Sequence, residues 1–329
     1  MENTNQTTLS PKPDPQKYIE LADSTYLSFM RGGKYKDIIA GMTDLGDYTL
    51  RNQLLIQSQR PDATKVNTMN GWNYRKRHIV KGSESIKILA PVFDKTITTD
   101  TAGNVVEKTS DYVTGYNVNS VFDISQTDGE PLKEWITGKT LEQHPALVET
   151  ALKDTLNGYT FAEGQIETDG VLDTRKRTIT LKSGMDEKQK LTALIRQIAA
   201  ALVVGRNRDR FQGLRSEQLP NITAIEISAA ANVVARKLGL EGGAVAEPDI
   251  TKMTDEDLQK FSNNIGVVRS ISQLMITGVE NALSADAKEK NLAAVRASEA
   301  EAFTETTTEK TTVKTTTKSR SKAVAEMGG

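Results

Sequence analysis

A run of basic residues beside two aromatic residues carries the side chains best suited to bind a ligand. The run comprises Trp72, Tyr74, Arg75, Lys76, Arg77 and Lys81. Cations neutralise phosphate groups, and flat rings stack on unpaired bases. The combination therefore predicts a surface that binds single-stranded nucleic acid.

The charge of this region differs from that of the whole chain. The 329 residues carry a net charge of −1, whereas residues 51–95 contain nine Lys or Arg and three Asp or Glu. This local excess adds Arg51 and Lys87 to the candidate phosphate contacts. The competing interpretation is a solvated basic turn with Trp72 in the core, because charge runs usually form solvated faces.

Residues that hold metal ions or act as nucleophiles are scarce. The chain has no cysteine, and its two histidines, His78 and His144, are far apart in sequence. These counts exclude a disulfide framework, a thiolate metal site, a cysteine nucleophile and a His-x3-His pair. We expect no bound metal and no cofactor.

The elements that would position the basic run predict an α+β domain over residues 17–137. Apolar periodicity indicates a helix over 17–42, broken at Gly32-Gly33, and a second helix over Leu50–Gln59 that ends before Pro61. Strand patterns cover 86–89 and 112–124, with a hairpin around 102–104. We expect the helices to pack on a mostly antiparallel sheet, with the basic run between the second helix and the sheet.

The remaining chain predicts a second, mainly helical domain with tails on both sides. This domain covers 138–243 and contains a hairpin at 170–181 and helices at 186–204 and 221–240. A helical extension follows over 244–303, with an apolar stripe typical of a core or a dimer seam at Ile265, Val268, Ile271, Leu274 and Met275. The polar segments 1–16 and 304–329 have the composition of a disordered leader and a disordered Thr/Lys-rich tail.

Short motifs in a fixed order resemble the ArdC-type antirestriction proteins and the LtrC-like proteins of conjugative elements. They are Asn52–Ile56 (NQLLI), Pro61–Thr64 (PDAT), the pair Trp72 and Arg77, Lys81-Gly82, Ile88–Pro91 (ILAP) and Val121–Leu132 (VFDISQTDGEPL). The resemblance implies that residues 17–137 form a domain that binds single-stranded DNA. The chain departs from the family at Lys76, where the family has Gly, and at Ser83, where it has Glu.

The same resemblance implies a degenerate zincin-like second domain. In the family, two His one helical turn apart bind zinc and a Glu between them activates water. Here Arg196 and Ala200 stand at the ligand positions, Gln197 at the base, and Ser228 at the third ligand. Neither alanine nor a cationic arginine can ligate zinc, and glutamine cannot accept the proton that a general base takes. The resemblance therefore implies a domain that is not an enzyme.

Three functions compete on the sequence alone. The first is a sequence-tolerant single-stranded DNA-binding protein of a plasmid, conjugative element or phage, which protects DNA from nucleases or assists its transfer or replication. The second is a non-catalytic interaction module that binds a protein partner through the second domain or the tail. The third is a divergent metallohydrolase, for which the sequence offers no ligand set.

The sequence shows neither a secretory signal at its N-terminus nor an apolar run long enough to span a membrane. The first residues contain no basic segment followed by an apolar one. The longest apolar runs are far shorter than the ~20 residues that span a bilayer. We expect a cytoplasmic protein that does not contact membranes.

Overall fold

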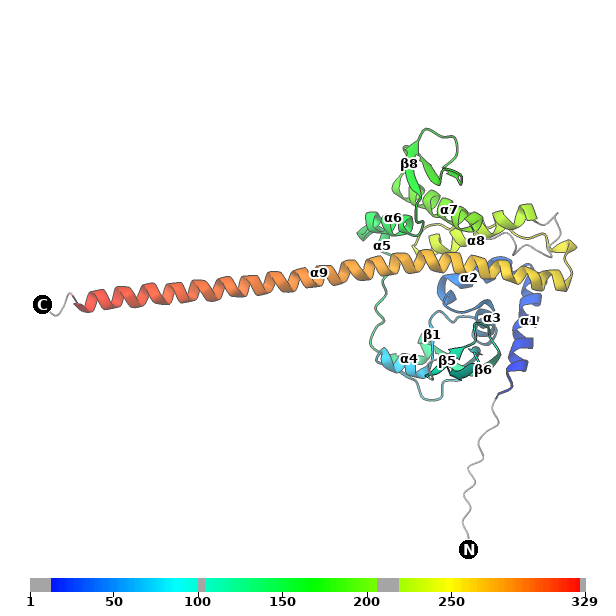
Figure 1. The fold of residues 1–329 in the computed structure, drawn as a ribbon, viewed down its shortest axis with the longest axis horizontal. Coiled ribbons are helices and arrows are strands. Elements are labelled where there is room, and N and C mark those ends of the chain that lie inside the picture. The colour runs from blue at the N-terminus through cyan, green and yellow to red at the C-terminus, as the bar shows by residue number, and fades with distance from the viewer. Residues whose placement is uncertain (1–12, 100–103, 206–218, 326–329) are drawn as a thin grey trace, which may run out of the picture.

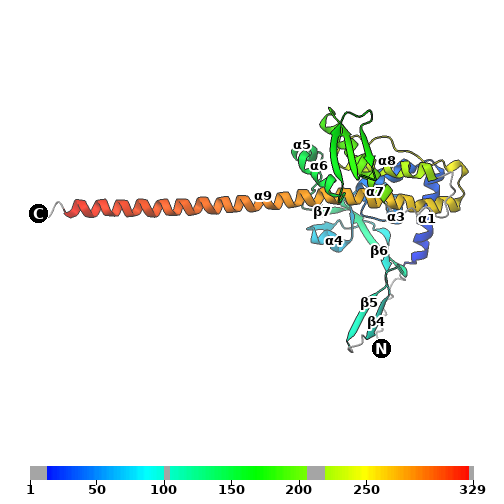
Figure 2. The same ribbon diagram turned by 45° about the horizontal axis from the view of Figure 1, so that its top comes forward.

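The chain forms a mixed α+β body traversed by one long helix (Figure 1). The computed structural model describes residues 13–99, 104–205 and 219–325. The long helix, α9 (Asp255–Ala325), runs between two groups of elements, and both views show this arrangement (Figures 1 and 2). The predicted α+β class is confirmed.

The first group contains the elements that come from the N-terminal part of the chain. In order they are α1 (Pro15–Arg31), α2 (Tyr35–Leu45), α3 (Leu50–Gln59), β1 (Val66–Asn67), α4 (Met69–Tyr74), β2 (Arg77–Ile79), β3 (Ile86–Val92), β4 (Lys95–Thr99), β5 (Val105–Thr109), β6 (Gly115–Asp123) and β7 (Thr127–Gly129). The predicted break between the first helices is confirmed, since Gly33 has a φ of 67° that glycine adopts without steric cost. The predicted helix over Leu50–Gln59 is also confirmed.

The sheets of this group are antiparallel. β6 lies between β1 and β3, and its ladder with β3 runs from the pair Ile86 and Val121 to the pair Val92 and Gly115. β4 and β5 then pair with each other and form the predicted hairpin. This hairpin projects from the body as a two-stranded arm (Figure 2).

The second group combines helices with a small mixed sheet. Its elements are α5 (Thr140–Gln143), α6 (Pro145–Asp154), β8 (Thr160–Gly164), β9 (Gly170–Asp173), β10 (Thr178–Lys182), α7 (Glu187–Gly205) and α8 (Leu219–Lys237). The predicted hairpin corresponds to β9 and β10, which pair antiparallel. The sequence patterns missed β8, which pairs with β10 in parallel.

One hydrophobic core continues across the predicted domain boundaries. Buried side chains of α1 and α2 join those of α6, α7, α8 and the first half of α9. The Tyr26 hydroxyl donates to the Leu258 carbonyl at 2.7 Å, and Arg31 pairs with Asp255 at 2.7 Å. The segment predicted as a helical extension therefore begins as a central helix of the body.

The buried stripe of α9 agrees with the predicted one at four of five positions. Ile265, Val268, Ile271 and Met275 are buried, whereas Leu274 is 47 % exposed. The prediction was wrong for Leu274 because the buried face continues through Ser272 and Val279, which leaves Leu274 on the flank of the helix.

The C-terminal part of α9 extends away from the body (Figures 1 and 2). The low-complexity segment that the sequence predicts to be disordered continues this helix to Ala325, while residues 326–329 lie outside the described residues. The predicted leader lies mostly in residues 1–12, which are also outside them; α1 begins at Pro15, capped by Asp14. Within the described ranges, no helix combines the length and apolar content required of a membrane span.

Candidate nucleic-acid interface

The basic turn, defined here as Tyr74–Lys81, begins at the last residue of α4, includes β2 and ends before β3. Thr68 caps α4 by accepting a hydrogen bond from the Gly71 amide at 3.1 Å. α4 ends at Tyr74, whose side chain is 90 % exposed. Arg75, Lys76 and Lys81 are exposed as well. The turn therefore presents an aromatic ring and three cations to solvent.

Arg77 holds the basic turn to β7 instead of lying free on the surface. Its guanidinium Nε donates to Thr127 Oγ1 at 2.8 Å, and its terminal nitrogens donate to the carbonyls of Thr127, Gly129 and Glu130. These bonds use most of the five donors of the side chain. The expected role of Arg77 as a phosphate ligand is therefore corrected to that of an anchor for the turn.

The backbone at the centre of the turn is tightly constrained. Lys76 has a φ of 56°, in the left-handed region that costs a residue with a Cβ about 1 kcal/mol or more. Opposite it, a Cβ on Gly129 would lie 2.3 Å from the Lys76 carbonyl oxygen, so only glycine fits there. The Lys76 ammonium group lies 3.3 Å from a Glu130 carboxylate oxygen, and both side chains are largely exposed.

Trp72 is a core residue, which corrects its prediction as a base-stacking side chain. Its side chain is only 2 % exposed, and its indole Nε1 donates to the Phe122 carbonyl at 2.9 Å. Because α4 buries the face that carries Trp72 against β6, the ring cannot reach a base. Tyr74, two residues later, lies on the opposite, exposed side.

The two outlying candidates, Arg51 and Lys87, already have partners in the structure. Arg51, on α3, pairs with Asp23 at 3.1 Å and remains partly exposed. The Lys87 ammonium group donates to Ser120 Oγ at 2.7 Å on the surface of the β3–β6 ladder. Both bonds involve exposed or half-exposed groups, so a phosphate could replace the partner at little cost.

Two residues of the motif Val121–Leu132, Asp123 and Gln126, fix the frame of the interface, although the sequence predicted no individual role for them. The Asp123 carboxylate accepts hydrogen bonds from the amides of Thr64, Lys65 and Ser125 at 2.9–3.0 Å. Burial raises the pKa of Asp123, but these hydrogen bonds outweigh it and leave the pKa below its ordinary value. Gln126 completes the link by donating to the Glu84 carbonyl at 2.7 Å. The motif Val121–Leu132 was a signal for these residues, but its role is structural.

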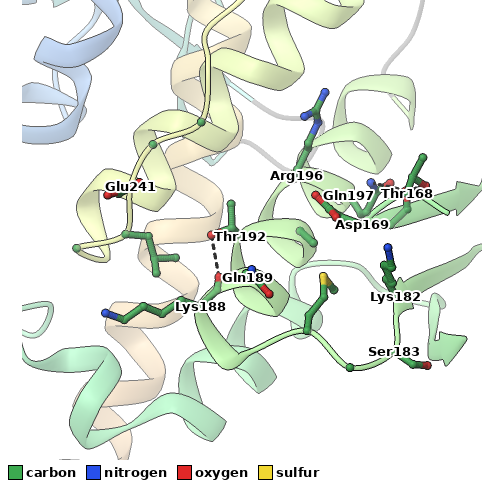
Figure 3. Close-up of a pocket in the computed structure, with 18 residues that line it drawn as sticks. Thr168, Asp169, Lys182, Ser183, Lys188, Gln189, Thr192, Arg196, Gln197 and Glu241 are labelled. Atoms are coloured by element: carbon green, nitrogen blue, oxygen red, sulfur yellow. Dashed lines mark hydrogen bonds between the residues drawn. The ribbon is translucent and has the colours of Figure 1, made fainter. Parts of the chain in front are cut away.

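The positions aligned with a zinc site lie on or beside a large cleft in the second group of elements. Arg196 and Gln197 line this cleft of about 1260 Å³ (Figure 3). Gln197 donates to the Gly170 carbonyl at 3.0 Å, and the Ser228 hydroxyl accepts a bond from the Ala246 amide. With Ala200 offering no donor atom, this set does not fit a zinc ion. Across the residues that the structure describes, no group of three His, Cys, Asp or Glu could hold a metal.

Comparison with known proteins identifies similar structures but no similar sequence. No protein-family model and no curated protein match the chain. The structure is similar to the metal-free crystal structure of the antirestriction protein ArdC from plasmid R388, with a TM-score of 0.44 and 12% identity over 80% of this chain and 98% of that one. The Mn(II)-bound structure of that protein gives a TM-score of 0.38 and 12% identity over 81% of this chain and 95% of the other. Both structures are of the same protein, in its metal-free and Mn(II)-bound forms.

Proposed function

We propose that this chain is a sequence-tolerant single-stranded DNA-binding protein whose contact surface is the basic turn. In this proposal Arg75, Lys76 and Lys81 contact phosphates, and Tyr74 stacks on an unpaired base. Arg51 and Lys87, outside the turn, are further candidate phosphate contacts. The motif resemblance points to the DNA of a mobile element, where a bound protein would shield the strand from nucleases or assist its transfer.

The observation that carries the proposal is the pairing of an almost fully exposed Tyr74 ring with exposed cations on a rigid backbone. A solvated basic turn does not need an exposed aromatic ring, whereas base stacking requires one. Arg77 and the β2–β7 pairing hold the turn in place, so little conformational entropy is lost on binding. No side chain in the turn reads base edges in this proposal, which predicts tolerance to sequence.

We further propose that the second group of elements does not act as a hydrolase. The support is the chemistry of the side chains: Arg196 is a cation, and the amide of Gln197 is bonded to the Gly170 carbonyl. Metal analysis of the purified protein tests this proposal directly. Stoichiometric zinc or manganese would contradict it.

Fluorescence anisotropy with a labelled single-stranded oligonucleotide and its matching duplex, at two salt concentrations, tests DNA binding. We expect tighter binding to the single strand and a marked loss of affinity at the higher salt concentration, because binding releases counterions. Equal affinity for the duplex, or no binding at low salt, would overturn the proposal.

A double variant locates the contact surface. Arg75→Ala/Lys81→Ala should weaken binding to all sequences alike and lower the slope of log K against log salt by about 1.4, or about 0.7 for each lost phosphate contact. The matched control is Arg175→Ala/Lys176→Ala, which removes the same charges from the exposed β9–β10 turn. If both double variants lose affinity equally, the chain binds DNA through its general charge and not through the basic turn.

A further inference from the structure

The cleft beside α7, with a volume of about 1260 Å³, is a cavity that the DNA-binding proposal leaves unused. Its walls are formed by α7, by the chain that leads into β9 and out of β10, and by the glycine-rich segment 239–243 (Figure 3). α7 turns its apolar face toward the core through Leu191, Leu194, Ile195 and Ile198. The opposite, polar face of the same helix therefore lines the cleft.

Two cations lie at the ends of this polar face. Lys188, Thr192 and Arg196 follow one another at intervals of four residues, which places them on one side of the helix. Figure 3 shows Lys188 and Arg196 at opposite ends of the row, with Thr192 between them. Both cations are exposed, and within the described part of the chain neither forms an ion pair.

The spacing of Lys188 and Arg196 along the helix axis matches a repeat in an extended peptide. Eight residues of α-helix span about 12 Å, at ~1.5 Å per residue. In an extended chain, side chains four residues apart lie on the same face and about 13 Å apart, at ~3.3 Å per residue. We propose that the cleft binds an extended segment of a partner protein that carries two acidic side chains four residues apart, one for Lys188 and one for Arg196.

The composition of the cleft favours a peptide over nucleic acid. Its other walls carry Asp169, Glu241 and Lys182, and the Lys182 ammonium group donates to the Glu167 carbonyl at 3.3 Å (Figure 3). The two carboxylates would repel a continuous row of phosphates. Among the described residues that line it there is no aromatic ring on which a base could stack. A peptide with two acids among neutral residues meets the two α7 cations and avoids both carboxylates. This site is separate from the proposed DNA surface, so either proposal can fail alone.

Selection from a random-peptide phage library against the full chain tests the proposal. We expect the selected peptides to be enriched in Asp or Glu pairs at positions i and i+4. In fluorescence anisotropy with a selected, labelled peptide, Lys188→Glu/Arg196→Glu should weaken binding about tenfold or more, since both contacts become repulsive. The uncharged double variant Lys188→Gln/Arg196→Gln should lose less peptide affinity than the charge-reversed variant. It keeps the test valid if the charge-reversed variant does not fold.

Matched controls separate this site from general charge and from DNA binding. Arg175→Glu/Lys176→Glu makes the same charge reversal outside the cleft and should leave peptide affinity unchanged. Binding of the single-stranded oligonucleotide should not change in Lys188→Glu/Arg196→Glu. No enrichment of spaced acidic pairs, equal peptide binding by the cleft variant, or displacement of the peptide by the oligonucleotide would each overturn the inference.

Discussion

The side-chain amide of Asn52 forms both hydrogen bonds that the backbone of Leu89 offers at the outer edge of β3. Asn52 Nδ2 donates to the Leu89 carbonyl and Asn52 Oδ1 accepts from the Leu89 amide, each at 2.9 Å. Gln59, seven residues later on α3, bonds the amide and carbonyl of Lys87 in the same way. α3 therefore replaces a neighbouring strand and closes an edge that would otherwise be free to pair with another chain.

This relationship predicts that Asn52→Asp destabilises the fold. A carboxylate cannot donate to the Leu89 carbonyl, so a buried acceptor loses its partner, at a cost of about 1–3 kcal/mol in the free energy of unfolding. Gln59→Glu is the matched control, because it makes the same change at an exposed position and should cost less. Urea denaturation of the three proteins measures the difference. Equal stability of Asn52→Asp and the wild type would refute the edge-closing role.

Trp72 and Tyr74 should respond to substitution in opposite ways. Tyr74→Ala should lower affinity for the single-stranded oligonucleotide by the ~1–3 kcal/mol of one stacked base and leave the melting temperature unchanged. Trp72→Phe should lower the free energy of unfolding by about 1 kcal/mol, because it removes the hydrogen bond to Phe122, and should leave affinity unchanged. Fluorescence anisotropy measures the DNA affinity of Tyr74→Ala and Trp72→Phe, and thermal denaturation measures their stability. Loss of affinity in Trp72→Phe alone would reverse the assignment.

Lys76 carries a charge at a backbone position that suits glycine, so its two properties can be separated by mutation. Lys76→Gly should raise the free energy of unfolding by up to about 1 kcal/mol by removing the strain at a φ of 56°. Both Lys76→Gly and Lys76→Ala should reduce the salt slope of DNA binding by about 0.7. Lys76→Ala keeps the strained backbone and should show no gain in stability. Equal stability of Lys76→Gly and Lys76→Ala would show that the backbone at Lys76 is not strained.

Asp123 should make stability depend on pH in the acid range. Its pKa is lowered in the folded state, so its ionised form stabilises the fold above the unfolded pKa of ~3.9, and this stabilisation is lost as pH falls through the lower, folded pKa. Asp123→Asn should destabilise the protein at pH 7, by about 1–3 kcal/mol, because its NH2 group faces at least one backbone N–H donor in either orientation of the amide, that of Ser125 or those of Thr64 and Lys65. Denaturation curves should show this difference shrinking below pH 4. A constant difference would contradict the assigned role.

Local signals in the sequence predicted most of the helices and the antiparallel hairpins. Pro61 and Gly33 mark the ends of helices in the sequence itself, and the predicted and observed bounds of α3 coincide. β8 was missed because its parallel partner, β10, is its neighbour in the sheet but not in the sequence, where β9 comes between them. No turn residue in the sequence indicates such a pair. The burial of one face of α9 was also predictable, but the helices that cover it were not.

The amino-acid sequence by itself determined the local excess of positive charge, the limits of α3 and the lack of metal-ligating groups at Arg196 and Ala200. These properties depend on residue type and on neighbours within one or two turns. Only the tertiary structure decided that Tyr74 faces solvent while Trp72 is buried. It also decided that the Arg77 guanidinium forms hydrogen bonds with backbone carbonyls near β7. The reason is physical: the partners of Trp72 and Arg77 lie about fifty residues farther along the chain, and folding alone brings them within hydrogen-bond distance.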